Sequence, residues 1–376
     1  MTVLFGGSFD PPHIAHTEMA EAVANLNETE KLVIIPAFSA PLKNGAKESY
    51  KHRFNMCELA FGFIKKAEIS NIEEIINLKN KTEKSYTVDT IKTYIAQNNL
   101  KEKPYFLIGA DSAEHLNEWK NAKELCLICN FLVFKRNGKI NTSVLDKLNA
   151  NYKILDFLPK NYSSTKIREN IAFNDVSEKV KQYIMANSLY NIDEKYKEIL
   201  QKNMGKRRYN HSLNVAEEAV RLAKKYNADE NLAYTAGLLH DITKEIPQKT
   251  QLKFCSEFGI LMNDIEKNSF KLWHAITGAY YVKYILAIEN EDIFDAIRYH
   301  TTAKPNMPLL SKIIYLADYT SKERDYDGVE DMRKYVDISL EKAMLEALKF
   351  TVEDVSAKGL PVHPDTLNAL KEAESK

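Results

Sequence analysis

The chain has 376 residues, 44% of them hydrophobic and 28% charged, and its 52 basic and 52 acidic residues cancel. This composition is typical of a globular protein, and the length exceeds that of a usual single domain, so we expect two domains. A net charge of zero provides no overall field that would attract nucleic acid or an anionic membrane. Any recognition of phosphate must therefore take place in local pockets.

The sequence contains no segment suited to a membrane or to secretion. Its longest apolar stretch, residues 125–134, is interrupted by Asn130 and falls short of the roughly 20 residues that a membrane span needs. The start lacks a basic segment followed by a long apolar one, and four cysteines do not make a disulfide framework. Cys126 and Cys129 have metal or redox spacing, but without a second pair we expect them to pack in the core. These features favour a cytoplasmic protein.

The beginning of the chain carries the strongest local signal. The apolar run Val3–Phe5 predicts a buried parallel strand, and Gly6 and Gly7 let the backbone approach a ligand closely. Two prolines then precede a helical pattern in which His13 and His16 share one face near the positive helix end. This order is typical of a phosphate-binding strand, turn and helix. We predict that both histidines donate to a transferring phosphate and stabilise its charge by position rather than by covalent attack.

Apolar runs alternate with helical patterns through the first half of the chain and predict a parallel α/β fold. The clearest strands are residues 3–5, 32–35, 105–108 and 131–134. After about residue 191 the β-branched runs stop, and amphipathic patterns predict an all-α second half. Its clearest helices are residues 213–225, 232–239, 293–299 and 309–319. We place the boundary in the polar segment 187–194, which predicts an α/β domain over 1–190 and a helical domain over 195–376.

Two further segments of the first half can contribute to a phosphate site. Lys43 follows the second predicted strand in a loop, where it could hold a phosphate or simply be solvated. Residues 162–168 place three hydroxyls, from Ser163, Ser164 and Thr165, before a helical pattern with Arg168 one turn on. Hydroxyls, backbone amides and a guanidinium can therefore converge on a polyphosphate. Taken alone, the hydroxyl cluster could also be only a helix cap.

Four segments in this order resemble the His-x-x-His nucleotidyltransferase superfamily and, within it, the bacterial nicotinate mononucleotide adenylyltransferases. The opening motif Gly-Gly-Ser-Phe-Asp-Pro-Pro-His-Ile-Ala-His is residues 6–16, and the closing ATP motif is residues 162–168. Between them lie the substrate segment 85–90 and the central strand and turn 106–111. The resemblance covers nearly the whole first half. It implies a Rossmann-like domain that transfers AMP from ATP to nicotinate mononucleotide and releases pyrophosphate.

The same resemblance implies roles for individual residues, with Mg²⁺ accompanying ATP. The groups at the reacting phosphates would be His13, His16, Lys43 and Arg168. The other ATP-binding residues would be Gly6, Gly7, Ser8, Phe9, Asp111, Ser163, Ser164 and Thr165. The mononucleotide would lie against Ser85, Tyr86, Thr87 and Trp119. An indole can stack on a pyridine ring, although Trp119 could also be plain core.

The chain departs from the usual motifs of this family at three positions. Serine replaces threonine at Ser8, alanine replaces glycine at Ala15, and leucine replaces histidine at Leu42. None of these departures removes a charged catalytic group. Leu42 does lack the hydrogen-bond donor that a histidine would provide beside Lys43.

The histidines of the second half are sparse but ordered, and their order favours a metal site. The candidate ligands are His211, His240, Asp241, His274, His300 and Asp318. A helical bundle can bring such side chains inward around a metal. Any one of them has an ordinary explanation by packing or exposure, but the ordered set points to metal binding. Imidazoles with carboxylates suit iron, manganese, cobalt or zinc.

Short sequence segments in this half resemble those of the HD-domain phosphohydrolases, particularly the bacterial group that hydrolyses diadenosine tetraphosphate symmetrically to two ADP. The matching segments are residues 208–212, 238–244, 296–302 and 314–319. The resemblance covers residue 195 to the end and implies that the six candidate ligands surround a di-iron centre, which would promote attack of water on phosphorus. The remaining phosphates would be bound by Lys244, Arg298 and Arg324, for which solvated surface positions are the alternative.

We therefore expect a bifunctional enzyme that makes nicotinate adenine dinucleotide, the precursor of NAD, and hydrolyses diadenosine tetraphosphate. In one alternative, the helical half hydrolyses another nucleotide, such as a guanosine alarmone. In another, it is a metal-binding nucleotide sensor without turnover. The expected partners are ATP, nicotinate mononucleotide and diadenosine tetraphosphate. The sequence leaves open the native metal, the preference for the acid or the amide mononucleotide, and whether the protein is a homo-oligomer.

Overall fold

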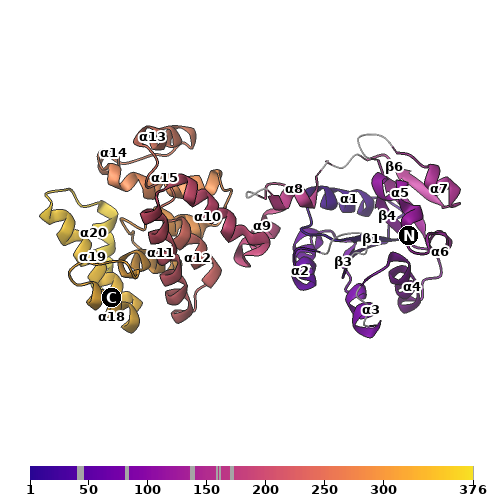
Figure 1. Cartoon of the computed structure of the whole chain (residues 1–376), viewed down its shortest axis with the longest axis horizontal. Coiled ribbons are helices and arrows are strands. Elements are labelled where there is room, and N and C mark those ends of the chain that lie inside the picture. Colours follow the sequence, from indigo (N-terminus) through magenta and orange to yellow (C-terminus); the bar gives the residue numbers. More distant parts are fainter. Residues whose placement is uncertain are drawn as a thin grey trace. The chain divides into compact units, whose positions relative to one another are not determined.

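The computed structural model describes residues 1–39, 46–80, 84–135, 140–157, 160, 162–169 and 173–375. The chain divides into two compact units, residues 1–183 and 184–376. The first unit is α/β with a parallel sheet and the second is helical, which confirms the predicted fold class (Figure 1). Within the described ranges, no helix is both long enough and apolar enough to cross a bilayer.

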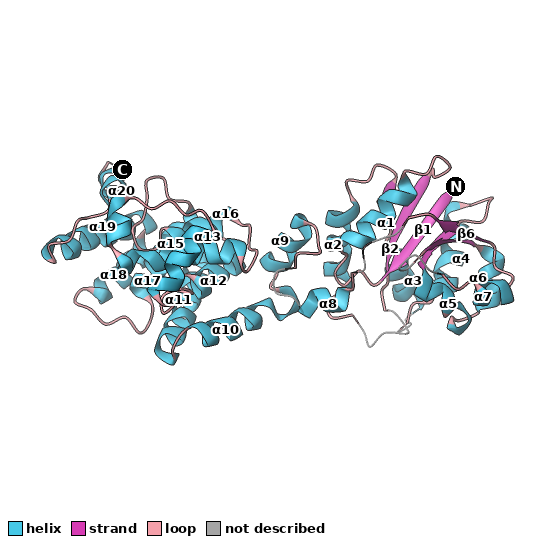
Figure 2. Cartoon of the chain, turned by 90° about the horizontal axis from the view of Figure 1, so that it is seen from above, coloured by secondary structure: helices cyan, strands magenta, loops and turns pink. Residues whose placement is uncertain are grey.

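The sheet of the N-terminal unit has six parallel strands in the order β3-β2-β1-β4-β5-β6. The strands, drawn in magenta in Figure 2, are β1 Thr2–Gly7, β2 Lys31–Pro36, β3 Ala67–Ile69, β4 Tyr105–Gly109, β5 Asn130–Phe134 and β6 Tyr152–Leu155. The order reverses between β1 and β4, because the chain builds outward from β1 to β3 and then outward from β4 to β6. In open parallel sheets, ligands bind beyond the carboxyl ends of the strands at such a reversal.

Helices cover both faces of this sheet. They are α1 Ile14–Ala24, α2 Tyr50–Phe61, α3 Ile72–Asn80, α4 Thr87–Asn98, α5 Ala110–Glu114, the 3₁₀ helix η1 Leu116–Glu118, α6 Ala122–Ile128, α7 Ser143–Lys147 and α8 Ser164–Glu169. Along β1, Leu4 joins a core shared with α3, α4 and α6, whereas Phe5 packs against Phe61 of α2 with ring centroids 6.4 Å apart. Because both faces are buried, the central strands are continuous apolar runs.

The two cysteines with metal-like spacing are part of this packing. Cys126 lies on α6 and Cys129 follows it directly, and both are buried and free. Burial raises the pKa of the Cys129 thiol to about 12, so it stays protonated near neutral pH. The expectation that they pack in the core is therefore confirmed.

The C-terminal unit consists of helices. After α9 Glu178–Ala186, which contains the division between the units, they are η2 Leu189–Asn191, α10 Ile192–Asn203, α11 Lys206–Lys225, α12 Glu230–Leu239, α13 Gln248–Glu257, α14 Asp264–Asn268, α15 Phe270–Tyr284, α16 Glu291–Arg298, α17 Leu309–Thr320, α18 Val329–Ile338, α19 Leu340–Ala357 and α20 Pro364–Glu374. Helices α11, α12, α16 and α17 form the centre of the unit. A Cβ on Gly237 of α12 would lie 2.9 Å from Cα of Ala216 on α11, so these backbones approach very closely.

Candidate active sites

His13 and His16 lie at the amino end of α1, shortly after β1. His13 is the residue that precedes the helix, and the two imidazole rings stack with centroids 3.6 Å apart. The backbone N–H of His13 donates to Nδ1 of His16 at 3.2 Å. Because Nδ1 of a neutral His16 is then an acceptor, its proton lies on Nε2. This nitrogen is therefore a donor for an anion at the positive end of the helix.

A cavity of about 760 Å³ lies at the sheet reversal and is lined by both histidines; we call it the histidine cavity. It is also lined by eight other residues predicted to contact ATP, namely Gly6, Gly7, Ser8, Phe9, Ser163, Ser164, Thr165 and Arg168. The predicted Asp111 is exposed in the first turn of α5, between Gly109 and Ser112, which line the cavity. Lys43 lies outside the described residues.

The start of α8 is tied to the turn that carries the histidines. The hydroxyl of Ser164 donates to the carbonyl of Pro11 at 3.0 Å. Arg168 donates to the carbonyl of Asp10 at 2.5 Å, and Nη1 lies 3.7 Å from the carboxylate of Asp10. Its other terminal nitrogen donates to Oγ1 of Thr165 at 3.1 Å. These bonds hold the hydroxyls and the guanidinium in the wall of the histidine cavity.

A buried arginine that the sequence analysis missed fixes the same wall. Arg53 of α2 is only 1% exposed. Its guanidinium donates to the carbonyls of Ser8, Ala37 and Phe38 at 2.8, 2.7 and 3.1 Å. A single cation therefore satisfies the turns that follow β1 and β2. A lone arginine in a helical pattern gives no sequence signal for such a role, because its partners are backbone carbonyls.

A second cavity, of about 590 Å³, adjoins the first and shares Gly6, Gly7 and Ser8 with it. Its lining includes all four residues predicted to contact the mononucleotide, Ser85, Tyr86, Thr87 and Trp119, and we call it the tyrosine cavity. Trp119 is half-buried, and its ring meets Phe106 edge-on with centroids 6.2 Å apart. Trp119 thus belongs both to the edge of the core and to the cavity wall.

Glu73 of α3 is a buried carboxylate in the wall of the tyrosine cavity. It accepts the backbone N–H of Phe38 at 2.8 Å and the hydroxyl of Thr90 at 3.0 Å. Burial raises the pKa of Glu73. Glu73 is not distinguished in the sequence, because one acidic residue in an amphipathic helix is usually solvated.

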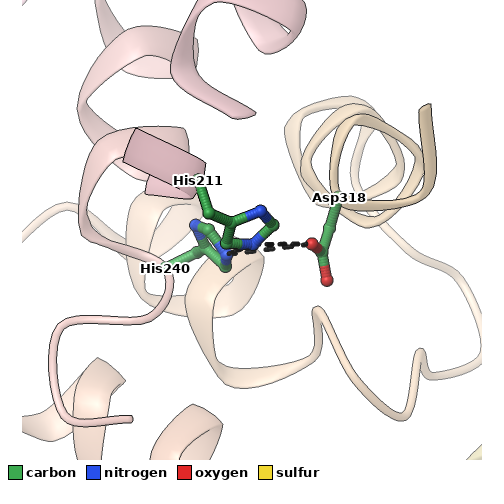
Figure 3. A group of neighbouring side chains, drawn as sticks. All are labelled: His211, His240 and Asp318. Carbon is green, nitrogen blue, oxygen red and sulfur yellow. Dashed lines mark hydrogen bonds and ion pairs between the residues drawn. The ribbon is translucent and has the colours of Figure 1, made fainter. Parts of the chain in front are cut away.

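The six candidate ligands of the C-terminal unit lie close together. Figure 3 shows three of them, which come from α11, the end of α12 and α17. Nε2 of His211 lies 3.1 Å from Oδ1 of Asp318 and 3.3 Å from Nε2 of His240. The other three are Asp241, His274 on α15 and His300 after α16. Residues more than 100 positions apart in the sequence therefore form one cluster.

Asp241 connects the two sides of this cluster. Its Oδ2 lies 3.7 Å from Nε2 of His211 and 3.5 Å from Nε2 of His240. Its Oδ1 lies 3.1 Å from Nε2 of His274 and 3.6 Å from Nε2 of His300. The two carboxylate oxygens thus face different pairs of histidines.

Backbone carbonyls orient two of the imidazole rings. Nδ1 of His240 donates to the carbonyl of Gly237, and Nδ1 of His300 donates to the carbonyl of Ile297, both at 2.7 Å. Because a carbonyl can only accept, the ring proton lies on Nδ1 and the lone pair of Nε2 faces the cluster. Metal-ligating histidines are typically held in this way.

The charge state of the cluster fits divalent metal ions. Burial lowers the pKa of His274 to about 4, so this imidazole is neutral near pH 7. Burial acts to raise the pKa of Asp241, but His240 and His274 outweigh it and hold that pKa well below its usual range. Nε2 of His274 and Nε2 of His300 lie only 3.1 Å apart. For His211, burial acts to lower the pKa, but Asp318 and Glu323 outweigh it and raise that pKa. Imidazoles that converge on an ionised carboxylate are a donor set for transition metals, whose binding releases any ring proton at the ligating nitrogen.

Lys244 and Arg208 approach the cluster. Nζ of Lys244 lies 2.9 Å from Nε2 of His274, and burial lowers the pKa of Lys244. Nη1 of Arg208 donates to Oδ2 of Asp241 at 2.8 Å. Of these two residues, only Lys244 is predicted from the sequence. The position of Arg208 one helical turn before His211 is the signal that could have identified it.

Arg324 and Arg298, both predicted to bind phosphate, have different surroundings. Arg324 bonds to the carboxylate of Asp318 and donates to its carbonyl at 2.6 Å, so it lies beside the cluster. Arg298 instead forms an ion pair with the buried Glu266. Its charge is therefore compensated inside the unit. Glu323, which the sequence analysis did not consider, accepts from Nδ1 of His211.

Both halves of the chain match known protein families. The family model for cytidylyltransferase-like proteins matches residues 4–170, and that for the HD domain matches residues 208–323. A Mycoplasma pneumoniae protein named probable nicotinate-nucleotide adenylyltransferase/Ap4A hydrolase is 30% identical over 338 residues, which cover 90% of this chain and 92% of that protein.

Two relatives match one half each. The symmetrical bis(5'-nucleosyl)-tetraphosphatase of Halalkalibacterium halodurans is 38% identical over 170 residues, 45% of this chain and 90% of that protein. The probable nicotinate-nucleotide adenylyltransferase of Fusobacterium nucleatum is 33% identical over 188 residues, 48% of this chain and 95% of that protein. With two matching halves and a full-length relative, the chain belongs to the family of fused nicotinate-nucleotide adenylyltransferase/Ap4A hydrolase proteins.

Proposed function

We propose that residues 1–190 transfer AMP from ATP to nicotinate mononucleotide and that residues 195–376 hydrolyse diadenosine tetraphosphate to two ADP. The observation that carries this proposal is the presence of two chemically different sites in one chain. One is a pair of adjoining cavities at a sheet reversal, and the other is a largely buried cluster of imidazoles and carboxylates. Both sites suit substrates that contain adenosine phosphates.

In the N-terminal domain, ATP would occupy the histidine cavity and the mononucleotide the tyrosine cavity. The two cavities share seven lining residues, so the reacting phosphates would meet beside them. These are Gly6, Gly7, Ser8, Ala37, Phe106, Ser112 and Trp119. A mononucleotide phosphate oxygen attacks the α-phosphorus of ATP, and the bond to the departing pyrophosphate breaks. Nε2–H of His16 and the guanidinium of Arg168 stabilise the charge that develops. We expect ATP to arrive with Mg²⁺, which neutralises the leaving pyrophosphate.

In the C-terminal domain, the six clustered side chains would hold two metal ions, which we propose to be iron. When bound, such ions supply an activated water at neutral pH and offset charge on phosphate oxygens. The carbonyls of Gly237 and Ile297 keep two of the imidazoles in the ligating tautomer. Lys244, Arg208 and Arg324 would bind the phosphates that flank the broken bond, since each reaches a side chain of the cluster. Arg298 would contribute only if its ion pair with Glu266 opens.

The first test of this proposal is a product analysis with the full chain. The protein is reconstituted separately with iron, manganese and cobalt, incubated with diadenosine tetraphosphate or a guanosine alarmone, and the nucleotides are resolved by chromatography. We expect ADP alone from diadenosine tetraphosphate. A parallel incubation with ATP, Mg²⁺ and nicotinate mononucleotide should give the dinucleotide and pyrophosphate. Absence of cleavage with every metal would overturn the hydrolase assignment and leave the transferase assignment to its own assay.

A further inference from the structure

Lys120 is a charged residue of the tyrosine cavity that the proposed function does not yet use. It follows Trp119 directly and lines the cavity. Its Nζ lies 4.1 Å from the centre of the Tyr86 ring and 3.1 Å from Oδ2 of Asp89. Tyr86 and Asp89 belong to the start of α4, so two contacts hold the ammonium beside the residues expected to surround a pyridine ring.

The other charged residues in this wall are acidic. Glu73 is buried, and Glu118 bonds to the imidazole of His115 at 2.8 Å. Among the described residues that line the tyrosine cavity, Lys120 is the single lysine or arginine. Without its ammonium, the side chains of this wall would present negative charge to a ligand. Such a wall would repel a ring that carries a carboxylate.

The amino end of α4 contributes positive potential at the same place. The backbone N–H groups of Asp89 and Thr90 donate to the carbonyl of Tyr86, as expected for a first helical turn. The N–H groups of the preceding two residues, Thr87 and Val88, have no acceptor within the helix. The helix end and the ammonium of Lys120 therefore act in the same direction. Any sequence in this conformation would have the same backbone amide groups. The Lys120 side chain is therefore the contribution that is specific to this chain.

We propose that Lys120 is a specificity-determining residue, which favours a pyridine mononucleotide with a ring carboxylate over the one with a neutral amide. This inference rests on the adenylyltransferase function proposed above. An ammonium makes a charge-assisted hydrogen bond with a carboxylate, whereas an amide offers only a neutral acceptor. Asp89 keeps the ammonium in place and also competes for it, which limits the gain. Lys120 acts on ground-state binding of the mononucleotide, so its effect appears in KM.

The test compares four full-length proteins: the wild type, Lys120→Gln, Lys120→Arg and Lys92→Gln. Lys92 is a matched control, because it lies on α4 and pairs with Glu124 at 2.6 Å but does not line the cavity. For each protein, kcat and KM are measured with ATP and either nicotinate or nicotinamide mononucleotide. We expect Lys120→Gln to lower the ratio of kcat/KM for acid over amide by about 10-fold, through KM for the acid. Lys120→Arg and Lys92→Gln should keep the wild-type ratio within about threefold.

Two results would overturn the inference while the proposed function stands. One is a wild-type ratio in Lys120→Gln. The other is an equal loss for both mononucleotides, which would indicate a purely structural role. A wild type that makes a dinucleotide from neither mononucleotide would instead overturn the proposed function, and this inference with it.

Discussion

In the N-terminal unit most of the candidate substrate-binding groups line two cavities of about 760 and 590 Å³. In the C-terminal unit, by contrast, five of the six candidate ligands are buried, Asp318 is half-buried, and the six lie in contact with one another. The first site consists of backbone turns, hydroxyls and a few basic side chains. The second consists of imidazoles and carboxylates whose lone pairs converge. The first arrangement suits a substrate that brings its own negative charge, and the second suits cations that the protein retains.

The two sites also differ in how the chain builds them. The motif 6–16 carries both histidines of the first site on one strand, turn and helix start. The six candidate ligands of the second site lie on or just after five helices, α11, α12, α15, α16 and α17, with His240 and Asp241 both following α12. Loss of one group should therefore weaken the first site by about one interaction. Loss of one ligand should disable the second site, because all six ligands would hold the same metal ions.

The largest effect is expected from Asp241→Asn. This change removes the ionised carboxylate whose two oxygens face two pairs of histidines. We expect hydrolysis of diadenosine tetraphosphate to fall by about 10³-fold or more, and bound metal to fall with it, while the transferase rate is unchanged. Initial rates and elemental analysis of the purified protein measure both.

The control for this change is Asp331→Asn, which removes an exposed carboxylate paired with Lys334 in the same unit. It should retain metal and hydrolysis. Hydrolysis by Asp241→Asn at the wild-type rate would contradict the prediction that the six ligands hold the same metal ions.

A smaller loss is expected from His16→Ala in the other site. The change removes the Nε2–H donor at the amino end of α1 but leaves the backbone groups and Arg168 in place. Removal of one donor to a developing negative charge typically costs about 10² to 10³ in rate, and we expect a loss of that size in dinucleotide formation. Hydrolysis should be unaffected. The exposed His115 gives a control variant, His115→Ala, and an unchanged transferase rate in His16→Ala would refute the phosphate-site assignment.

Removal of the metal should separate the stabilities of the two units. A ligand that binds only the folded state at about 100 times its Kd stabilises that state by about 2.7 kcal/mol. We therefore expect a chelator to lower the thermal transition of the C-terminal unit and to leave that of the N-terminal unit in place. Differential scanning calorimetry with and without chelator measures this. A shift of both transitions would indicate that the metal does not belong to the C-terminal cluster alone.

The smallest effect compares two glycines, one from each unit. Gly237→Ala would place Cβ 2.9 Å from Cα of Ala216, and the carbonyl of Gly237 also orients His240. We expect the free energy of unfolding to fall by about 1 to 3 kcal/mol. At Gly109, no heavy atom lies within 4 Å of an added Cβ, so Gly109→Ala should change it by less than about 0.5 kcal/mol. Denaturant titration measures the free energy of unfolding of both variants. An equal loss in the two would contradict the closer backbone packing at Gly237.

The sequence by itself determined the fold class and the local motifs, because these depend on neighbouring residues. Continuous apolar runs predicted β1, β2, β4 and β5, which are buried on both faces. The edge strands β3 and β6 escaped prediction because they are short and partly exposed. Helix α11 begins at residue 206 rather than at the predicted residue 213. The prediction started too late because residues 206–212 are mostly polar and carry no amphipathic apolar pattern.

Only the tertiary structure decided which distant side chains meet. It brings the six candidate ligands into one cluster, and it gives Arg53 and Glu73 partners that no local pattern indicates. It also pairs Arg298 with Glu266, a contact that spacing along one helix cannot reveal. The physical reason is that the charge state and the direction of a buried polar group depend on groups from other elements packed around it. Those neighbours exist only after the chain has folded.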